Sequence, residues 1–175
     1  IRIMFAARGG FEYYNPPAPA NDPYWANVGL LMNYETTLIN LDSSATKAVV
    51  SIAGNPKPSL ATPLTSGGSM YFTGTSFAYV QTASSKFSYG TGNFTIEFWI
   101  KANTTQDTYS MIMDSSTDNS GTGIGVGQNF GTAGKLSFFA QGGVTSSLIS
   151  ANTVTDNTWR HIACVKSANT GMLFV

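Results

Sequence analysis

The chain has 175 residues, of which only 10% are charged, and its nine basic and nine acidic side chains cancel. Because no basic block is present and no run of 18 apolar residues could span a bilayer, we expect neither a nucleic-acid nor a membrane partner. The low charge and the 18 glycines, with abundant serine, threonine and asparagine, favour a β-rich protein of an extracellular or virion-type setting.

The first twenty residues do not look like the start of a domain. Ile1–Phe5 predicts a short strand, and Arg8-Gly9-Gly10 predicts a turn. Asn15–Ala20 is rich in proline and predicts an extended, polyproline-like linker. These features suggest that a boundary between modules lies near the beginning of the chain.

After the linker, short apolar segments alternate with turn signals and no helical period is found. Gly54–Pro58 and Thr65–Gly68 are expected to be loops. The expected strands before and after the strongest segment are Val28–Tyr34, Ala48–Ala53, Ser69–Phe72, Phe77–Gln81, Tyr109–Asp114, Gly123–Val126, Lys135–Ala140 and Ser146–Ser150. A spacing of about ten residues between such strands is typical of an all-β sandwich or jelly roll.

Gly92–Lys101 is the strongest strand signal in the chain. Its side chains alternate strictly, so one face is wholly apolar and the other amphipathic. The predicted inner face carries Phe94, Ile96, Phe98 and Ile100, and the outer face carries Thr95, Glu97, Trp99 and Lys101. A second strand, Thr158–Lys166, is followed by a turn and by Met172–Val175, and is expected to complement the first.

Three segments resemble the laminin-G-like branch of the concanavalin A-like lectin/glucanase jelly rolls. They are GNFTIEFWIK at Gly92–Lys101, NTWRHIACVKSANTGMLFV at Asn157–Val175 and SMYFTGTSFAYVQT at Ser69–Thr82. The resemblance implies an all-β, two-sheet antiparallel jelly-roll sandwich. Because the family continues with further strands after the segment that matches Phe174-Val175, it also implies a sandwich incomplete at its C-terminal end.

The resemblance also implies a division into modules. The stretch IRI…AARGGFEYYNPPAP resembles the closing strand and exit of laminin-G-like domains in phage proteins, and Asp22–Met32 resembles their entry. We therefore expect residues 1–14 to be the closing strand and exit of a preceding module, and residues 15–21 to be a linker. Residues 22–175 would then form a truncated laminin-G-like domain.

The residues needed for catalysis are sparse. A retaining glycosidase needs two carboxyl groups about 5–5.5 Å apart, which alternate positions on one strand can supply. Glu12, Glu35 and Glu97 are far apart in sequence, so Glu97 is interpreted as a solvated outward side chain. We predict that the chain is not an enzyme.

The only histidine and the only cysteine do not predict a catalytic pair. His161 is expected to lie on the strand face opposite to Cys164, and no Gly-x-Ser-x-Gly elbow supplies a serine for it to activate. His161 is interpreted as a structural residue of the family's W-x-H pattern, and Cys164 as a small buried apolar residue.

Two other segments have compositions that are typical of ligand-binding loops. Gly121–Gly127 does not fit Gly-x-Gly-x-x-Gly in any register, and its glycines instead predict a bulged, tightly packed strand. Asp114, Asp118 and Asn119 are the best candidates for Ca²⁺, which takes oxygen ligands from loops, although an Asp-rich turn is the default interpretation. No other cofactor is expected.

Tyr13, Tyr14, Tyr24 and Trp25 cluster around the proline-rich linker and are the candidate binding or interface residues. They are expected to seal the junction between modules, or else to contact a sugar or a neighbouring subunit.

Together these features predict a non-enzymatic structural or adhesion module of a larger extracellular assembly, with a phage virion protein (a tail fibre, spike or capsid decoration) as the leading hypothesis. Its partners would be other virion or assembly subunits, through self-association, and its location the virion or the extracellular space. The alternative is a lectin-like module that recognises a host surface glycan.

Overall fold

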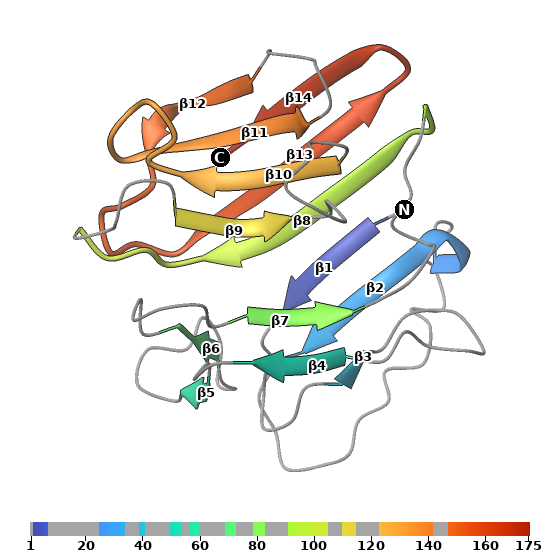
Figure 1. Cartoon of the computed structure of the whole chain (residues 1–175), viewed down its shortest axis with the longest axis horizontal. Helices are drawn as coiled ribbons and strands as arrows, with labels where there is room; N and C mark the ends of the chain where they lie inside the picture. The colour runs from blue at the N-terminus through green and yellow to red at the C-terminus, as the bar shows by residue number, and fades with distance from the viewer. Residues whose placement is uncertain are drawn as a thin grey trace. The chain divides into compact units, whose positions relative to one another are not determined.

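A computed structural model describes residues 2–6, 25–33, 39–40, 50–53, 57–59, 69–72, 79–82, 91–104, 110–114, 123–141 and 147–175 of the chain (Figure 1). The chain divides into two compact units, residues 1–86 and residues 87–175. Within the described ranges the regular structure consists of strands and one 3-10 turn, Trp25–Asn27. No helix in those ranges is long and apolar enough to cross a membrane.

The first unit contains short strands in three groups. β1 (Arg2–Ala6) pairs in parallel with β2 (Val28–Asn33), and β2 pairs antiparallel with β3 (Ile39–Asn40). The other two groups are antiparallel pairs, β4 (Val50–Ala53) with β7 (Tyr79–Thr82) and β5 (Lys57–Ser59) with β6 (Ser69–Tyr71). The predicted strand at the beginning of the chain is therefore present, while the proposed division into modules stays a prediction.

One loop prediction was wrong in this unit. Gly54–Pro58 was expected to be a loop, but Lys57–Ser59 forms β5, in which Pro58 lies opposite Met70. Proline has no N–H to donate and is tolerated in a strand only where one side is free of a ladder partner. A two-stranded pair provides such a position, so the proline signal marked an edge strand rather than a loop.

The second unit is built of two antiparallel sheets. The first contains β8 (Phe94–Ile100), β13 (Arg160–Ser167) and β14 (Thr170–Phe174), with β13 between the other two. The second contains β9 (Ser110–Asp114), β10 (Gly123–Gln128), β11 (Lys135–Gln141) and β12 (Ser147–Thr153), in the order β12-β11-β10-β9. This arrangement confirms the predicted all-β antiparallel sandwich.

The core of this unit lies between the two sheets. Phe94, Ile96 and Phe98 of β8 are buried as their alternation predicted, whereas Ile100 at the end of the strand is only half-buried. The rings of Phe94 and Phe138 meet edge to face, with centroids 6.2 Å apart, and so join the first sheet to the second. The other fully buried side chains of the sandwich include Val126, Leu136, Val154, Ile162 and Cys164.

The glycines of β10 pack as the sequence predicted. A Cβ atom on Gly127 would stand 2.3 Å from Cε2 of Phe130, and one on Gly125 would stand 2.4 Å from Cε2 of Phe139. The two aromatic rings therefore lie directly on the strand backbone, with centroids 5.2 Å apart. The pairing of β10 with β9 shifts register between Val126 and Gly127, which confirms the expected bulge.

Candidate functional site

Most of the residues that were predicted from the sequence to bind a ligand or a partner lie outside the described ranges. Asp118, Asn119, Tyr13, Tyr14 and Tyr24 all lie there. Asp114 is the last residue of β9 and Trp25 the first of the 3-10 turn, but the side chains of these two are not described. No cluster of three or more metal-ligating side chains occurs in the described part of the chain. The calcium site and the aromatic interface therefore stay predictions.

The candidate site in the described residues lies on the solvent side of the first sheet of the second unit. Residues directly opposite each other in antiparallel strands project from the same face, so the register decides which side chains meet there. We use the term outer face for Thr95, Glu97 and Trp99 of β8, His161, Ala163 and Val165 of β13, and Met172 and Phe174 of β14.

Trp99 and His161 form the most exposed pair on the outer face. They lie opposite each other in the β8–β13 ladder, and their ring centroids are 5.1 Å apart with the planes inclined by 49°. The side chain of Trp99 is 41% exposed, and His161 is also exposed. An indole that offers a flat apolar surface thus stands beside an imidazole that can donate and accept hydrogen bonds.

A second row crosses all three strands next to this pair. Ala163 lies between Glu97 on β8 and Phe174 on β14, and is opposite both of them in register. Ala163 is only 8% exposed, whereas Phe174 is 54% exposed. The low exposure of Ala163 shows that the larger neighbouring side chains cover it, so Phe174 is the most exposed member of this row.

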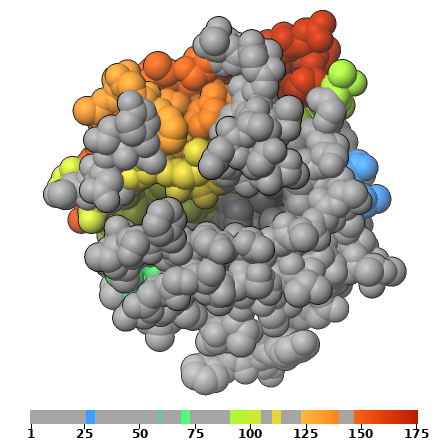
Figure 2. Space-filling model, viewed as in Figure 1, coloured from blue at the N-terminus to red at the C-terminus, as the bar shows by residue number. Residues whose placement is uncertain are grey.

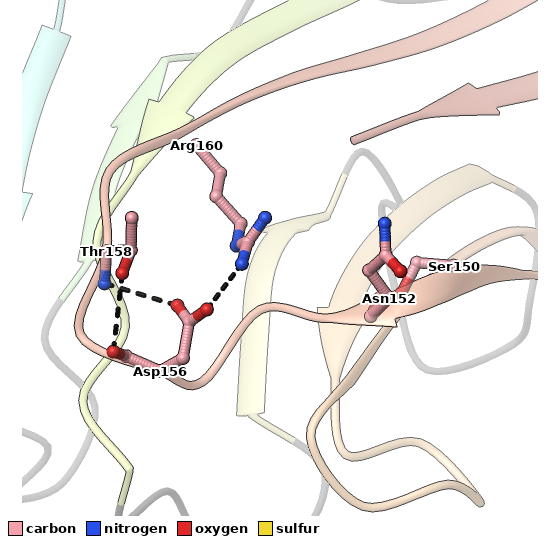
Figure 3. A network of polar contacts seen from close by, with 5 residues as sticks. All are labelled: Ser150, Asn152, Asp156, Thr158 and Arg160. Carbon is pink, nitrogen blue, oxygen red and sulfur yellow. Dashed lines mark hydrogen bonds and ion pairs between the residues drawn. The ribbon is translucent and has the colours of Figure 1, made fainter.

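The turn before β13 is ordered by one carboxylate. Asp156 accepts a hydrogen bond from the Thr158 amide at 3.2 Å and forms an ion pair with the Arg160 guanidinium (Figure 3). The hydrogen bond from Arg160 is the main reason why the pKa of Asp156 lies below its usual value. The ion pair is solvent-exposed, so it contributes to the shape of the turn more than to stability.

Backbone contacts hold the same turn on both sides. The amide of Asn157 donates to the carbonyl of Ala102, just after β8, at 2.8 Å, and the amide of Val154 donates to the carbonyl of Gly134 at 2.8 Å. Asn157 has a φ of 62°, a conformation that asparagine tolerates better than most residues. Because β13 starts from a turn that is hydrogen-bonded to the residue after β8, the register of the two strands is fixed there. This register places His161 opposite Trp99.

Contacts at the other end of β8 and β13 hold the same register. Lys166 Nζ donates to the carbonyl oxygens of Thr91 at 2.7 Å and Gly92 at 3.1 Å. The amide of Ala168, in the turn between β13 and β14, donates to Asn93 Oδ1 at 2.8 Å. The pairing of β8 with β13 is therefore restrained at both ends.

The opposite side of the same sheet, which faces the core, is apolar and chemically inert. Cys164 is fully buried, and desolvation raises the pKa of its thiol from 9.0 to about 12. A thiol at that pKa is protonated near neutral pH and does not act as a nucleophile. The prediction that Cys164 behaves as a small buried apolar residue is confirmed.

The outer face is not predicted as a site by any pattern in the sequence. Alternation in Gly92–Lys101 had correctly assigned Trp99 to the side opposite the core, and that was the available signal. His161 was interpreted as a structural residue, yet it lies exposed beside Trp99. Their proximity depends on the register of two distant strands, which no local pattern reports.

Comparison with known proteins supports the fold. A family model for laminin-G domains, described as the concanavalin A-like lectin/glucanases superfamily, matches residues 73–175. The matched region includes β8–β14 and therefore every residue of the outer face. A search of curated proteins found no match to the chain.

Proposed function

The chain belongs to the concanavalin A-like lectin/glucanases superfamily, whose laminin-G branch indicates a carbohydrate-binding or adhesion module. From that membership we propose that it is a non-enzymatic adhesion or structural module of a larger extracellular assembly. The assembly that best suits the sequence is a phage virion, in which the chain serves in a tail fibre, a spike or a capsid decoration.

The observation that carries this proposal is the pair of apolar edge strands on one side of the sandwich. Among the described strands, β12 and β14 each end their sheet. The two edges are close, because Leu148 Cδ1 lies 3.3 Å from where a Cβ atom on Gly171 would stand. Figure 2 shows the orange and red segments that contain these strands at the molecular surface. The large exposed hydrophobic residues on this side are Leu148, Ile149, Phe174 and Val175.

These edges carry only part of the usual protection. Soluble proteins blunt exposed strand edges with charges, proline or bulges that prevent pairing with another chain. The pairing of β12 with β11 shifts register between Lys135 and Ser137, but neither Ser147–Thr153 nor Thr170–Phe174 contains a charged residue or a proline. An uncharged apolar edge favours association with another β-strand, which is what subunits of an assembly supply.

The absence of catalysis is proposed on chemical grounds. Glu97 has Thr95 and Trp99 as its neighbours on the same strand face, so β8 provides no second carboxyl at the spacing that a retaining glycosidase uses. Asp156 is occupied by its contacts with Thr158 and Arg160. A reducing-sugar assay on cell-wall polysaccharides should detect no hydrolysis, and turnover would contradict this part of the proposal.

Charge placed on the edge tests the assembly role. We expect the purified chain to self-associate in sedimentation velocity, and Ile149→Lys and Phe174→Lys to shift it toward monomer, because a lysine must then be desolvated on pairing. Tyr71→Lys replaces an equally exposed aromatic residue on β6, in the other unit, and serves as the control. A wild-type chain that is monomeric at every concentration would contradict the proposal.

A second candidate function is recognition of a host surface glycan. The family membership favours it, and so does the outer face, which places an exposed tryptophan beside a histidine and a glutamate. The two functions are compatible, because an adhesion module of a virion can bind a glycan through one face and other subunits through an edge.

A further inference from the structure

We propose that the outer face binds a neutral saccharide, with the Trp99 indole as the stacking surface and with His161 and Glu97 as hydrogen-bonding groups beside it. This assignment rests on the second of the proposed functions, glycan recognition, and gives it a location and a ligand class. A pyranose ring has one face of C–H groups and a rim of hydroxyls. It therefore needs a flat apolar surface with polar groups at its margin.

Trp99 supplies the flat surface. The Trp99 side chain lies on the solvent side of the sheet and is 41% exposed. Its exposed apolar surface is hydrated unfavourably, so burial of that surface under a ligand is favourable. The strand holds the ring on a rigid support, with its neighbour Phe98 buried and its neighbour Ile100 half-buried, so little conformational freedom is lost when a ligand stacks on it.

His161 supplies the polar margin on one side. Its imidazole is inclined by 49° to the indole at a centroid distance of 5.1 Å, so the two rings do not stack face to face. An exposed imidazole offers one nitrogen donor and one nitrogen acceptor when neutral. Sugar hydroxyls are both donors and acceptors and can pair with either nitrogen.

The neighbouring row extends the site along the sheet. Glu97 is two residues from Trp99 on the same strand face, which brings a carboxylate next to the stacking surface. Ala163 lies between Glu97 and Phe174 and is covered by its neighbours, while Phe174 provides a second exposed ring. A chain of two or more sugar units can therefore run from Trp99 toward Phe174.

The charge of the face selects the ligand class. Among the residues of the outer face, Glu97 is the charged one. Lys101 follows β8 at the next alternate position, and its positive charge offsets the negative charge of Glu97. The Lys166 amine is directed to the carbonyls of Thr91 and Gly92. Sulfated or uronic polysaccharides need a cluster of basic groups, which these strands do not present, so neutral hexose polymers fit better.

The test compares neutral and acidic polysaccharides on the whole chain and its variants. Calorimetric titration with laminarin, mannan and dextran as neutral probes and heparin as the acidic probe measures affinity. We expect binding of at least one neutral probe and none of heparin. Trp99→Ala should weaken neutral binding by about tenfold, and Trp99→Phe, which keeps an aromatic ring, should weaken it less.

The control is Met111→Ala, which removes an equally exposed apolar side chain from the other sheet of the same unit and should leave affinity unchanged. Thermal unfolding of each variant shows that a loss of binding is not a loss of fold. A wild-type chain that binds none of the four probes overturns the site and glycan recognition together. If the chain binds a glycan with equal affinity after Trp99→Ala, or binds heparin alone, glycan recognition survives and the proposed site is wrong.

Discussion

Cys164 illustrates how a single side chain is defined by what surrounds it. Its thiol lies opposite Ile96 in the β8–β13 ladder and opposite Leu173 in the β13–β14 ladder, within the apolar layer of the sandwich. Burial there disfavours the thiolate and raises the pKa of the group from 9.0 to about 12. A residue type that is often reactive is thereby made unreactive in the folded chain.

The same burial makes stability depend on pH in alkaline solution. The folded chain keeps the Cys164 proton while the unfolded chain releases it, so the free energy of unfolding falls as the pH rises from about 9 toward 12. The loss from this group is at most about 4 kcal/mol, since one pKa unit corresponds to about 1.4 kcal/mol. Urea unfolding of the wild type and Cys164→Ala across this range should show a flatter dependence for the variant.

Labelling with a thiol reagent provides an independent check of that prediction. At pH 8 the native chain should react only as fast as it unfolds, and complete reaction should follow addition of denaturant. Rapid stoichiometric labelling of the native chain would show that Cys164 is accessible and would contradict the burial described above.

At the scale of one element, β10 depends on two glycines that face aromatic rings. The inward residues Ile124 and Val126 are buried in the core, and the opposite side of the strand is covered by Phe130 and Phe139 instead of by side chains of its own. Aromatic rings that cover strand glycines shield the backbone and offset the low strand propensity of glycine.

Gly127→Ala tests this packing. The added methyl group would stand 2.3 Å from the Phe130 ring, so the ring must leave its place over the strand. We expect a loss of about 1–3 kcal/mol in the free energy of unfolding, as for overpacked sites in general. In a Phe130→Ala background the same substitution should cost much less, and a double-mutant cycle of urea unfolding measures that difference.

Equal costs of Gly127→Ala with and without Phe130 would contradict the prediction, because they would place the strain in the backbone rather than against the ring. Ser137 also contacts Phe130, the residue whose ring covers Gly127. Its side chain is buried beside Phe130, whose carbonyl lies 3.5 Å from Ser137 Oγ.

At the scale of the whole molecule, the sandwich of the second unit depends on the buried apolar face of β8. Phe98→Asp would place a charge with no partner among buried apolar side chains, which costs several kcal/mol. Because a domain of this size is stable by only about 5–15 kcal/mol, we expect a large shift of the unfolding midpoint or complete loss of folding. Far-UV circular dichroism against urea measures it.

The matched control is Trp99→Asp, the same new side chain one position further along the strand. Trp99 points to solvent, so the charge stays hydrated and the midpoint should move little. Equal destabilisation by the two substitutions would contradict the assignment of inner and outer faces.

The sequence by itself determined the class of fold and the inner face of β8. Alternation is a local property, since successive side chains of any strand point to opposite sides. Phe94, Ile96 and Phe98 could therefore be assigned to the core before any partner strand was known. Alternation failed at Ile100, which is half-buried because the strand ends there. The turn signals failed at Pro58, whose edge position depends on the pairing with β6.

Only the tertiary structure decided which outward residues meet. The approach of His161 to Trp99, and the position of Ala163 between Glu97 and Phe174, depend on the registers of three strands. Those registers are set by the match of apolar residues across two sheets and by the anchored turns at both ends of β13. Neither cause is local in the chain, so the outer face existed in the sequence only as separate residues.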